Sequence, residues 1–213
     1  MKKSIVTALA ICLVSLAFAQ SDKYMNAMKA NIIQLDSIYQ KNNGAELANN
    51  FTRIADAEKT QWLPYYYAAY CTVVQAFTEK DNSKKDAIAD KAADLIKKAE
   101  IVLGNENSET NVIKSEIATV HLTVDPQNRY MTYGPESAEN LKKSAALDPT
   151  NPRPVLLEAQ GKFYTPEAFG GGKEVAKPLF EKAAKMFETF KPETDLSPVW
   201  GKANVDYFLS QYK

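Results

Sequence analysis

The sequence offers few residues that could cross-link the fold or bind a metal. Its 213 residues include two cysteines and one histidine. Cys12 lies in an N-terminal segment that we expect to be removed, which leaves Cys71 as the only cysteine of the mature chain. One cysteine cannot form an internal disulfide, and a zinc site needs more ligands than His121 and Cys71 supply. We therefore expect no metal, no cofactor and a fold held together by packing alone.

An excess of charge of one sign is lacking as well. The chain has 26 basic and 26 acidic residues, and loss of Lys2 and Lys3 with the N-terminal segment leaves 24 basic residues against the 26 acidic ones. No basic stripe indicates a nucleic-acid partner. No second long apolar run follows the one near the N-terminus, so we expect no transmembrane segment in the mature protein.

The first nineteen residues, 1–19, have the three parts of a secretory signal peptide. Two lysines open the segment, an apolar run of about fourteen residues covers 5–18, and the small residue Ala19 ends it. The run is shorter than the roughly 20 residues of a membrane-spanning helix. A retained anchor is one alternative, and a lipoprotein attached through Cys12 is another, although the large Ile11 precedes that cysteine. The sequence predicts cleavage after Ala19 and an exported protein, periplasmic or secreted.

Strand patterns are nearly absent from the remaining chain, 20–213. Alanine, lysine, glutamate and leucine recur with helical spacing, and turn residues interrupt them. We therefore predict an all-α fold. The expected helices lie near residues 22–41, 45–58, 61–78, 83–103, 108–124, 135–147, 152–164, 173–190 and 197–212.

Four of these helices repeat a pattern in which two alanines flank a large apolar residue. The three positions fall on one helix face, and the alanines allow a neighbouring helix to approach closely. Equivalent alanines of successive repeats are 44, 46 and 38 residues apart. The pattern occurs at Ala48/Phe51/Ala55, Ala92/Leu95/Ala99, Ala138/Leu141/Ala145 and Ala176/Leu179/Ala183.

The helices between these four share a second pattern. Pro64, Pro154 and Pro198 each stand five residues before an alanine, and Ile113 occupies the same position in another helix. Proline is favoured in a first helical turn, so these prolines predict helix starts. An alanine-rich bundle with chance matches is the alternative to a repeat. The two alternating patterns predict helical hairpins over 22–58, 61–103, 108–147 and 152–190, closed by a capping helix over 197–212.

A resemblance to a known family supports the repeat. The segment from Leu141 to Pro152 resembles the end of a tetratricopeptide (TPR) repeat and its turn into the next repeat, and 164–173 resembles part of small exported bacterial TPR-like proteins without an assigned activity. The resemblance implies a right-handed α-α solenoid of TPR-like hairpins. The spacing exceeds the 34 residues of a TPR. Two features depart from the family: the first hairpin, 22–58, has few signature residues, and Pro178 must either delay its helix to Ala176 or bend it.

No credible catalytic set is visible. Cys71 lies in an apolar helical stretch, where burial would make its thiol inert, so a nucleophilic pair with His121 is disfavoured. The glycines at 170–172 precede a lysine, but a Walker A loop needs Ser or Thr after that lysine, and Glu174 stands there. We interpret the glycines as a loop whose following helix start could attract an anion. The sequence predicts a protein that is not an enzyme.

Aromatic residues crowd the helix expected near 61–78. Consecutive residues are about 100° apart, so Tyr66 and Tyr70 form one row while Tyr67 and Cys71 form another. One row would pack in the core, and the other would line the concave face of the solenoid. Tyr66 is therefore a candidate binding residue, with core packing as the alternative.

Two long loops, 125–134 and 165–172, are expected on one edge of the solenoid in adjacent hairpins. Their mixture of aromatic and basic residues suits an interaction site. Simpler interpretations are that Arg129 pairs with Asp125 and that Tyr133 only turns the chain. The candidate residues of this edge are Asp125, Arg129, Tyr130, Tyr133, Tyr164, Phe169 and Lys173.

These observations favour a non-enzymatic exported repeat module that binds a protein or peptide partner. The alternative is a small-ligand or anion-binding protein, with or without enzymatic activity, that uses the loops at 125–134 and 165–172. A third possibility is self-association through the closing helix, around Trp200 and Phe208.

Overall fold

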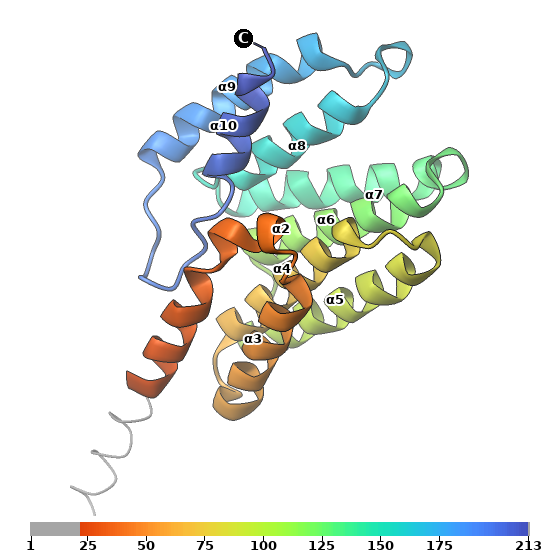
Figure 1. Ribbon diagram of the computed structural model, residues 1–213. Coiled ribbons are helices and arrows are strands. Elements are labelled where there is room, and N and C mark those ends of the chain that lie inside the picture. The colour runs from red at the N-terminus through yellow and green to blue at the C-terminus, as the bar shows by residue number, and fades with distance from the viewer. Residues whose placement is uncertain (1–21, 213) are drawn as a thin grey trace, which may run out of the picture.

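A computed structural model describes residues 22–212, and the predicted signal peptide lies outside this range. The described residues are all-helical, without a strand. After an N-terminal helix over 22–32 the elements follow in chain order (Figure 1). They are η1 (Leu35–Ser37), α2 (Ile38–Lys41), α3 (Gly44–Glu58), α4 (Trp62–Thr78), α5 (Asn82–Leu103), α6 (Ser108–Val124), α7 (Pro126–Leu147), α8 (Arg153–Tyr164), η2 (Glu167–Phe169), α9 (Lys173–Thr189) and α10 (Lys202–Ser210).

Each helix from α3 onward packs against the next one along the chain, and α6 also contacts α4 and α8. Figure 1 shows this succession rising from α3 to α9, with α10 lying across α8 and α9. The predicted bounds of α3 to α6, α8 and α9 agree with the structure to within one residue. The amphipathic spacing was sufficient here because each of these helices buries one face against its neighbours.

The helix expected over 22–41 is interrupted. Residues 33–34 form a turn, and η1 and the short α2 follow. The Ser37 hydroxyl donates to the carbonyl oxygen of Gln34 at 3.3 Å, and such a bond competes with the helical backbone pattern. The break allows Met28 before it and Ile38 after it to enter the same core.

The prediction of a long loop over 125–134 is wrong, because α7 already begins at Pro126. Asp125 caps this helix by accepting from the backbone N–H of Asn128 at 3.4 Å, and Pro126 suits a first helical position. Pro135 remains inside the helix. The preceding Gly134 has no Cβ to meet the proline ring, so the usual conflict before a proline is reduced.

The C-terminal part differs from the prediction in two places. Helix α9 begins at Lys173 and retains Pro178, so the late start at Ala176 is wrong. Helix α10 begins at Lys202 instead of 197, and Pro198 lies before it. Gly201 ends the preceding segment with a φ of 113°, and a Cβ there would lie 2.7 Å from the Phe187 ring. A tight glycine turn, and not the proline, starts the last helix.

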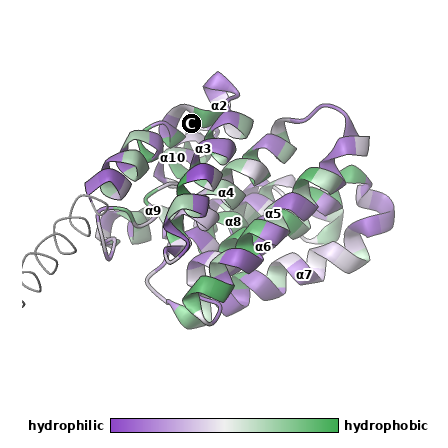
Figure 2. Ribbon diagram, turned by 90° about the horizontal axis from the view of Figure 1, so that it is seen from below, coloured by the Kyte–Doolittle hydropathy of each residue, from purple (hydrophilic) through white to green (hydrophobic). Residues whose placement is uncertain are grey.

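Residues 190–201, which we call the closing segment, connect α9 to α10 and contribute to the larger of two hydrophobic cores. The larger core extends from the N-terminal helix to α6 and includes Leu196 and Trp200 of the closing segment, and the smaller core combines α8, α9 and α10. Figure 2 shows the apolar stretches concentrated on α4 to α6 and more hydrophilic ribbon on the outer α7. Cys71 lies fully buried in the larger core, where burial raises the pKa of its thiol. Its predicted packing role agrees with this position.

Candidate functional site

Arg129 and Asp86 form the centre of a cluster that joins three helices. Arg129 of α7 donates from Nη1 and Nη2 to the two carboxylate oxygens of Asp86 on α5, at 2.7 and 2.9 Å. It also donates to the carbonyl oxygen of His121 on α6 at 3.1 Å. The Arg129 bond holds the pKa of Asp86 down at about 2. The simple expectation that Arg129 pairs with Asp125 is therefore wrong.

His121 and Tyr133 complete this cluster. The Nδ1 of His121 lies 2.8 Å from Asp86 Oδ1, and its ring stacks on that of Tyr133 with centroids 5.0 Å apart. Asp125 acts as the cap of α7, and the half-exposed Tyr130 ring packs on Gly134. The residues expected in a 125–134 loop are thus used mainly to attach α7 to α5 and α6.

The second half of the predicted edge differs in character. Tyr164 and Phe169 are 72 % and 74 % exposed. In the loop after α8 a Cβ on Gly171 would lie 2.2 Å from the carbonyl oxygen of Thr165, and Gly172 has a φ of 101°. These two glycines are required by the tight turn, which supports the interpretation as a loop. Among the described residues, no hydrogen bond, ion pair or ring contact joins this loop to residues 125–133, although Figure 1 shows both turns on the same side of the molecule.

An aromatic patch lies where α8, α9 and α10 meet. Phe163 packs edge-on against Phe208 at 5.1 Å and against Phe180 at 6.2 Å, and Phe180 stacks on Phe208 at 4.7 Å. Tyr164 and Tyr207 meet Phe208 edge-on at 6.0 and 5.3 Å. The members of this patch are Phe163, Tyr164, Phe180, Tyr207, Phe208 and Tyr212.

Two rings of the aromatic patch face solvent. Tyr207 is 60 % exposed and Tyr164 is 72 % exposed, whereas Phe208 beneath them is only 6 % exposed. Partial burial raises the pKa of Tyr164, and the neighbouring Tyr207 adds to the effect. Neither hydroxyl makes a hydrogen bond to another described residue. The patch therefore presents two exposed aromatic rings, whose hydroxyls have no hydrogen-bond partner among the described residues, on a buried apolar base.

Two lysines border the aromatic patch. The Nζ of Lys173 lies 5.6 Å from the centroid of the Phe163 ring, and the Nζ of Lys177 lies 5.7 Å from that of Tyr212. The Tyr212 hydroxyl donates to the carbonyl oxygen of Lys173 at 2.8 Å, which fixes this ring beside the start of α9. The aromatic patch therefore combines apolar rings with two cations at its border.

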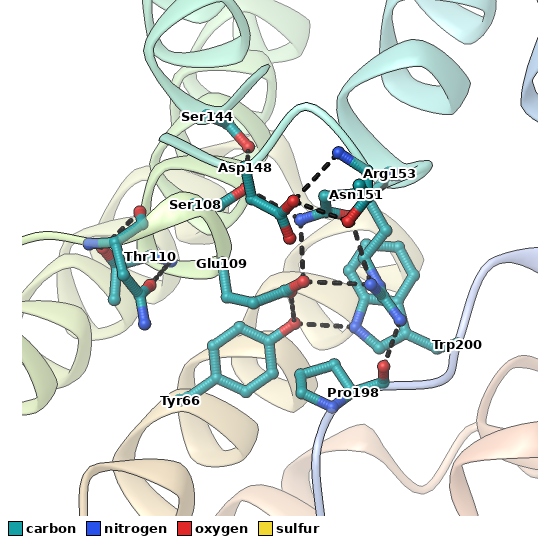
Figure 3. Close-up of polar contacts among 12 residues, drawn as sticks. Tyr66, Ser108, Glu109, Thr110, Ser144, Asp148, Asn151, Arg153, Pro198 and Trp200 are labelled. Atoms are coloured by element: carbon teal, nitrogen blue, oxygen red, sulfur yellow. Dashed lines mark hydrogen bonds and ion pairs between the residues drawn. The ribbon is translucent and has the colours of Figure 1, made fainter. Parts of the chain in front are cut away.

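Tyr66 belongs to a different and buried site. Its hydroxyl donates to Glu109 Oε2 at 2.8 Å and accepts from Trp200 Nε1 at 2.8 Å (Figure 3). Arg153 donates to the other oxygen of Glu109 at 2.9 Å and also to the carbonyl oxygen of Pro198. Tyr66 and Arg153 are 0 % exposed. The expectation that Tyr66 lines an open concave face is therefore wrong.

The closing segment covers the face of α4 on which Tyr66 lies. The Tyr67 hydroxyl donates to the carbonyl oxygen of Leu196 at 2.7 Å, and Tyr70 stacks on Trp200 at 4.6 Å. Both tyrosine rows of α4 are consequently buried. The polar bonds of Figure 3 fasten α4, α6 and α8 to the closing segment, so this part of the molecule has a structural role.

The described residues offer no metal site, and two surface hollows among them share no lining residue with the aromatic patch. Among the described residues, no group of three His, Cys, Asp or Glu side chains could hold a metal ion. Two shallow surface hollows lie along α9, beside Pro178, and between α3 and the end of α4, beside Gly44 and Thr78. No helix in the described part of the chain is long and apolar enough to cross a membrane.

Comparison with known proteins identifies a relative. No family profile matches the chain, and no curated protein sequence matches it. A solved structure, the HusA haemophore from Porphyromonas gingivalis, superposes on this chain with a TM-score of 0.77 and 35 % sequence identity. The match covers 89 % of this chain and 92 % of the HusA chain. The chain belongs to the HusA family.

The relative bears on two of the predictions. HusA is described as a haemophore, which is consistent with the predicted binding role. It also favours the small-ligand alternative over a protein or peptide partner. The resemblance to TPR proteins is not addressed by the match and stays a prediction. The only histidine of the sequence, His121, is already engaged by Asp86.

The sequence could have indicated the patch only in part. Tyr164 and Lys173 are candidates from the sequence because they lie beside a predicted loop, whereas Tyr207 belongs to the closing helix, for which the sequence suggests only self-association. Its proximity to Tyr164 depends on α10 folding back over α8, which no local pattern encodes. The proximity of Tyr207 to Tyr164 could have been predicted only if the sequence had indicated that the closing segment brings α10 back to the hairpin of α8 and α9.

Proposed function

We propose that this protein is an exported haem-binding protein and that its aromatic patch is the binding surface. The observation that carries the proposal is the pair of exposed rings, Tyr164 and Tyr207, above the buried Phe208 in a HusA-family chain. Exposed aromatic residues placed together on a rigid base are uncommon unless a ligand or partner covers them. The small-ligand alternative thus replaces the peptide partner as the leading function.

Haem matches the chemistry of this surface. Its porphyrin ring is flat and apolar, and an aromatic side chain gains about 0.5–1.5 kcal/mol from ring contact beyond simple burial. Its two propionates are negatively charged, and Lys173 and Lys177 supply ammonium groups at the border of the patch. Tyr164 and Tyr207 also carry phenol oxygens, a ligand type that haem iron accepts in some proteins.

A peptide partner on the inner face of the helices has less support. Both tyrosine rows of α4, one of which was expected to line the concave face, contact Leu196 and Trp200 of the chain itself. A peptide would have to displace bonds to Glu109 and Arg153 that lie in the protein interior. The aromatic patch requires no such rearrangement.

We further infer that the helices form a TPR-like right-handed solenoid and that the protein acts outside the cytoplasm. The packing of each helix on its successor, together with contacts of α6 to α4 and α8, supports a stack of hairpins. Export rests on the anatomy of residues 1–19. Binding haem in the cell envelope or outside the cell is consistent with both.

Haemin titration of the mature protein, residues 20–213, tests the function. We expect a saturable change in the Soret absorbance of haemin, and we expect the double variant Tyr164→Ala/Tyr207→Ala to weaken binding at least about tenfold, or 1.4 kcal/mol. The double variant Tyr164→Phe/Tyr207→Phe retains the rings. If it binds like the wild type, stacking provides the affinity, and if it loses a ligand-dependent Soret position, a phenol oxygen contacts the iron.

Tyr130→Ala is the matched control, because Tyr130 is another half-exposed tyrosine, on α7, and belongs to the edge first considered. It should leave haemin affinity unchanged. Absence of any saturable Soret change for the wild type would refute the function. Equal losses from Tyr130→Ala and from the patch variant would refute the location.

A further inference from the structure

Gly161 stands in helix α8 without a packing or backbone reason for being glycine. It is exposed, it lies within the helix, and a Cβ added to it would meet no atom within 4 Å. The other glycines of the chain either have a positive φ or lie against atoms that a Cβ would touch; they are Gly44, Gly104, Gly134, Gly170, Gly171, Gly172 and Gly201. Since glycine weakens a helix relative to alanine, its presence here costs stability that no contact within the protein offsets.

The position of Gly161 relates it to the aromatic patch. It is three residues before Tyr164 and four after Leu157, so the three residues lie on the same side of α8. Leu157 packs against the larger core, whereas Tyr164 is mostly exposed. Between them, the absence of a side chain leaves the helix backbone bare next to an exposed ring. No side chain therefore protrudes from α8 at this position.

Glycine here is not explained by the end of the helix. A glycine that ends a helix stands just after it with a positive φ, but the residue after α8 is Thr165, whose φ is −76°. The carbonyl oxygen of Gly161 accepts from the backbone N–H and the hydroxyl of Thr165 at 3.0 and 2.8 Å. Both bonds use only the backbone of Gly161 and would be retained with alanine.

We propose that Gly161 determines specificity for a flat macrocyclic ligand, because it lets the edge of a porphyrin resting on Tyr164 lie directly on the backbone of α8. This inference rests on the proposed function. A methyl group at this position would hold the macrocycle away from the helix and remove its short-range contacts, which decline steeply with distance. Glycine at this position thus lowers the stability of the free protein and permits closer contact with the ligand.

This role predicts that a single variant is more stable than the wild type and binds haemin more weakly. Gly161→Ala should raise the melting temperature of the ligand-free protein by about 2–4 °C, because alanine favours the helix. The same variant should weaken haemin binding by about tenfold, measured by Soret titration. Gly161→Leu, with a larger side chain, should weaken it further.

Glu136→Leu provides the control for added bulk, because Glu136 is an exposed helical residue on α7, outside the aromatic patch. It should leave haemin affinity within about twofold of the wild type, since exposed substitutions away from a site have small effects. Should Gly161→Leu fail to fold, Gly161→Ala alone decides the question.

The outcomes separate this inference from the proposed function. If wild-type protein binds haemin and Gly161→Ala binds it equally well, the role of Gly161 is refuted while the function stands. If Gly161→Ala weakens binding and also lowers the melting temperature, the loss reflects damage to α8 and the inference is likewise overturned. If the wild type does not bind haemin, both fall together.

Discussion

Replacing Arg153 by methionine should test how strongly the closing segment is fastened to the helices. Arg153 is 0 % exposed, donates to Glu109 and to the carbonyl oxygen of Pro198, and lies 5.1 and 5.2 Å from the rings of Phe190 and Trp200. Methionine fills a similar volume but removes the charge. It would leave Glu109, whose side chain is 13 % exposed, without its cationic partner.

The expected loss follows from this burial. Removing one partner of a buried ion pair typically costs 3–5 kcal/mol, because the remaining charge stays desolvated and unpaired. For a chain of this size the loss corresponds to a fall in melting temperature of roughly 6–20 °C. Urea unfolding followed by circular dichroism measures the free energy of unfolding. Arg53→Met, which replaces an arginine exposed on α3, should change it by no more than about 0.5 kcal/mol.

A second substitution separates the charge from the shape. Glu109→Gln in the Arg153→Met background removes the unpaired carboxylate, so the double variant should recover part of the lost stability. The hydrogen bond from Tyr66 can be retained by the glutamine oxygen. A loss below about 1 kcal/mol for Arg153→Met, or a double variant whose losses simply add, would refute a coupled buried pair.

Two further predictions concern pH. Burial raises the pKa of Glu116 to about 8, so the unfolded chain releases this proton at lower pH than the folded protein does, and the free energy of unfolding should fall as pH rises from about 5 to 8. Glu116→Gln should flatten this pH dependence in urea unfolding. An unchanged slope would contradict the assignment to Glu116. The contribution of Asp86 depends on pH in the opposite direction, because Arg129 holds the pKa of this carboxyl at about 2. Its stabilisation of the fold is present above pH 4 and is lost as pH falls toward 2. Arg129→Gln should therefore reduce the stability difference between pH 5 and pH 3, and equal differences in variant and wild type would show that the bond does not stabilise the fold.

Local helical signals predicted much of the fold. The helix-start prolines located α4 and α8 correctly, because Pro64 and Pro154 do occupy first turns. Pro198 misled the same reasoning, since it lies in the closing segment, where its carbonyl oxygen accepts from Arg153. A proline restricts its own backbone in either setting, and the sequence does not distinguish the two.

The candidate site was less predictable, for a physical reason. Local reasoning paired Arg129 with Asp125 four residues away, but α7 directs Arg129 toward Asp86, which is 43 residues distant in sequence. Tyr164 and Tyr207 likewise come together only because α10 packs on the last hairpin. Contacts between such distant residues depend on how helices are oriented, whereas periodicity reports only which face of each helix is apolar.

The most direct test of the account is a map of where haemin binds. Ferric iron broadens nuclear magnetic resonance signals of nearby nuclei, so haemin added to isotopically labelled mature protein reports its own position. We expect broadening of the amide signals around Gly161, Tyr164 and Tyr207, at the ends of α8 and α10, while signals of residues 125–133 stay sharp. Broadening centred on α7, or none beyond that of a non-binding control protein, would contradict the assignment of haem binding to the aromatic patch.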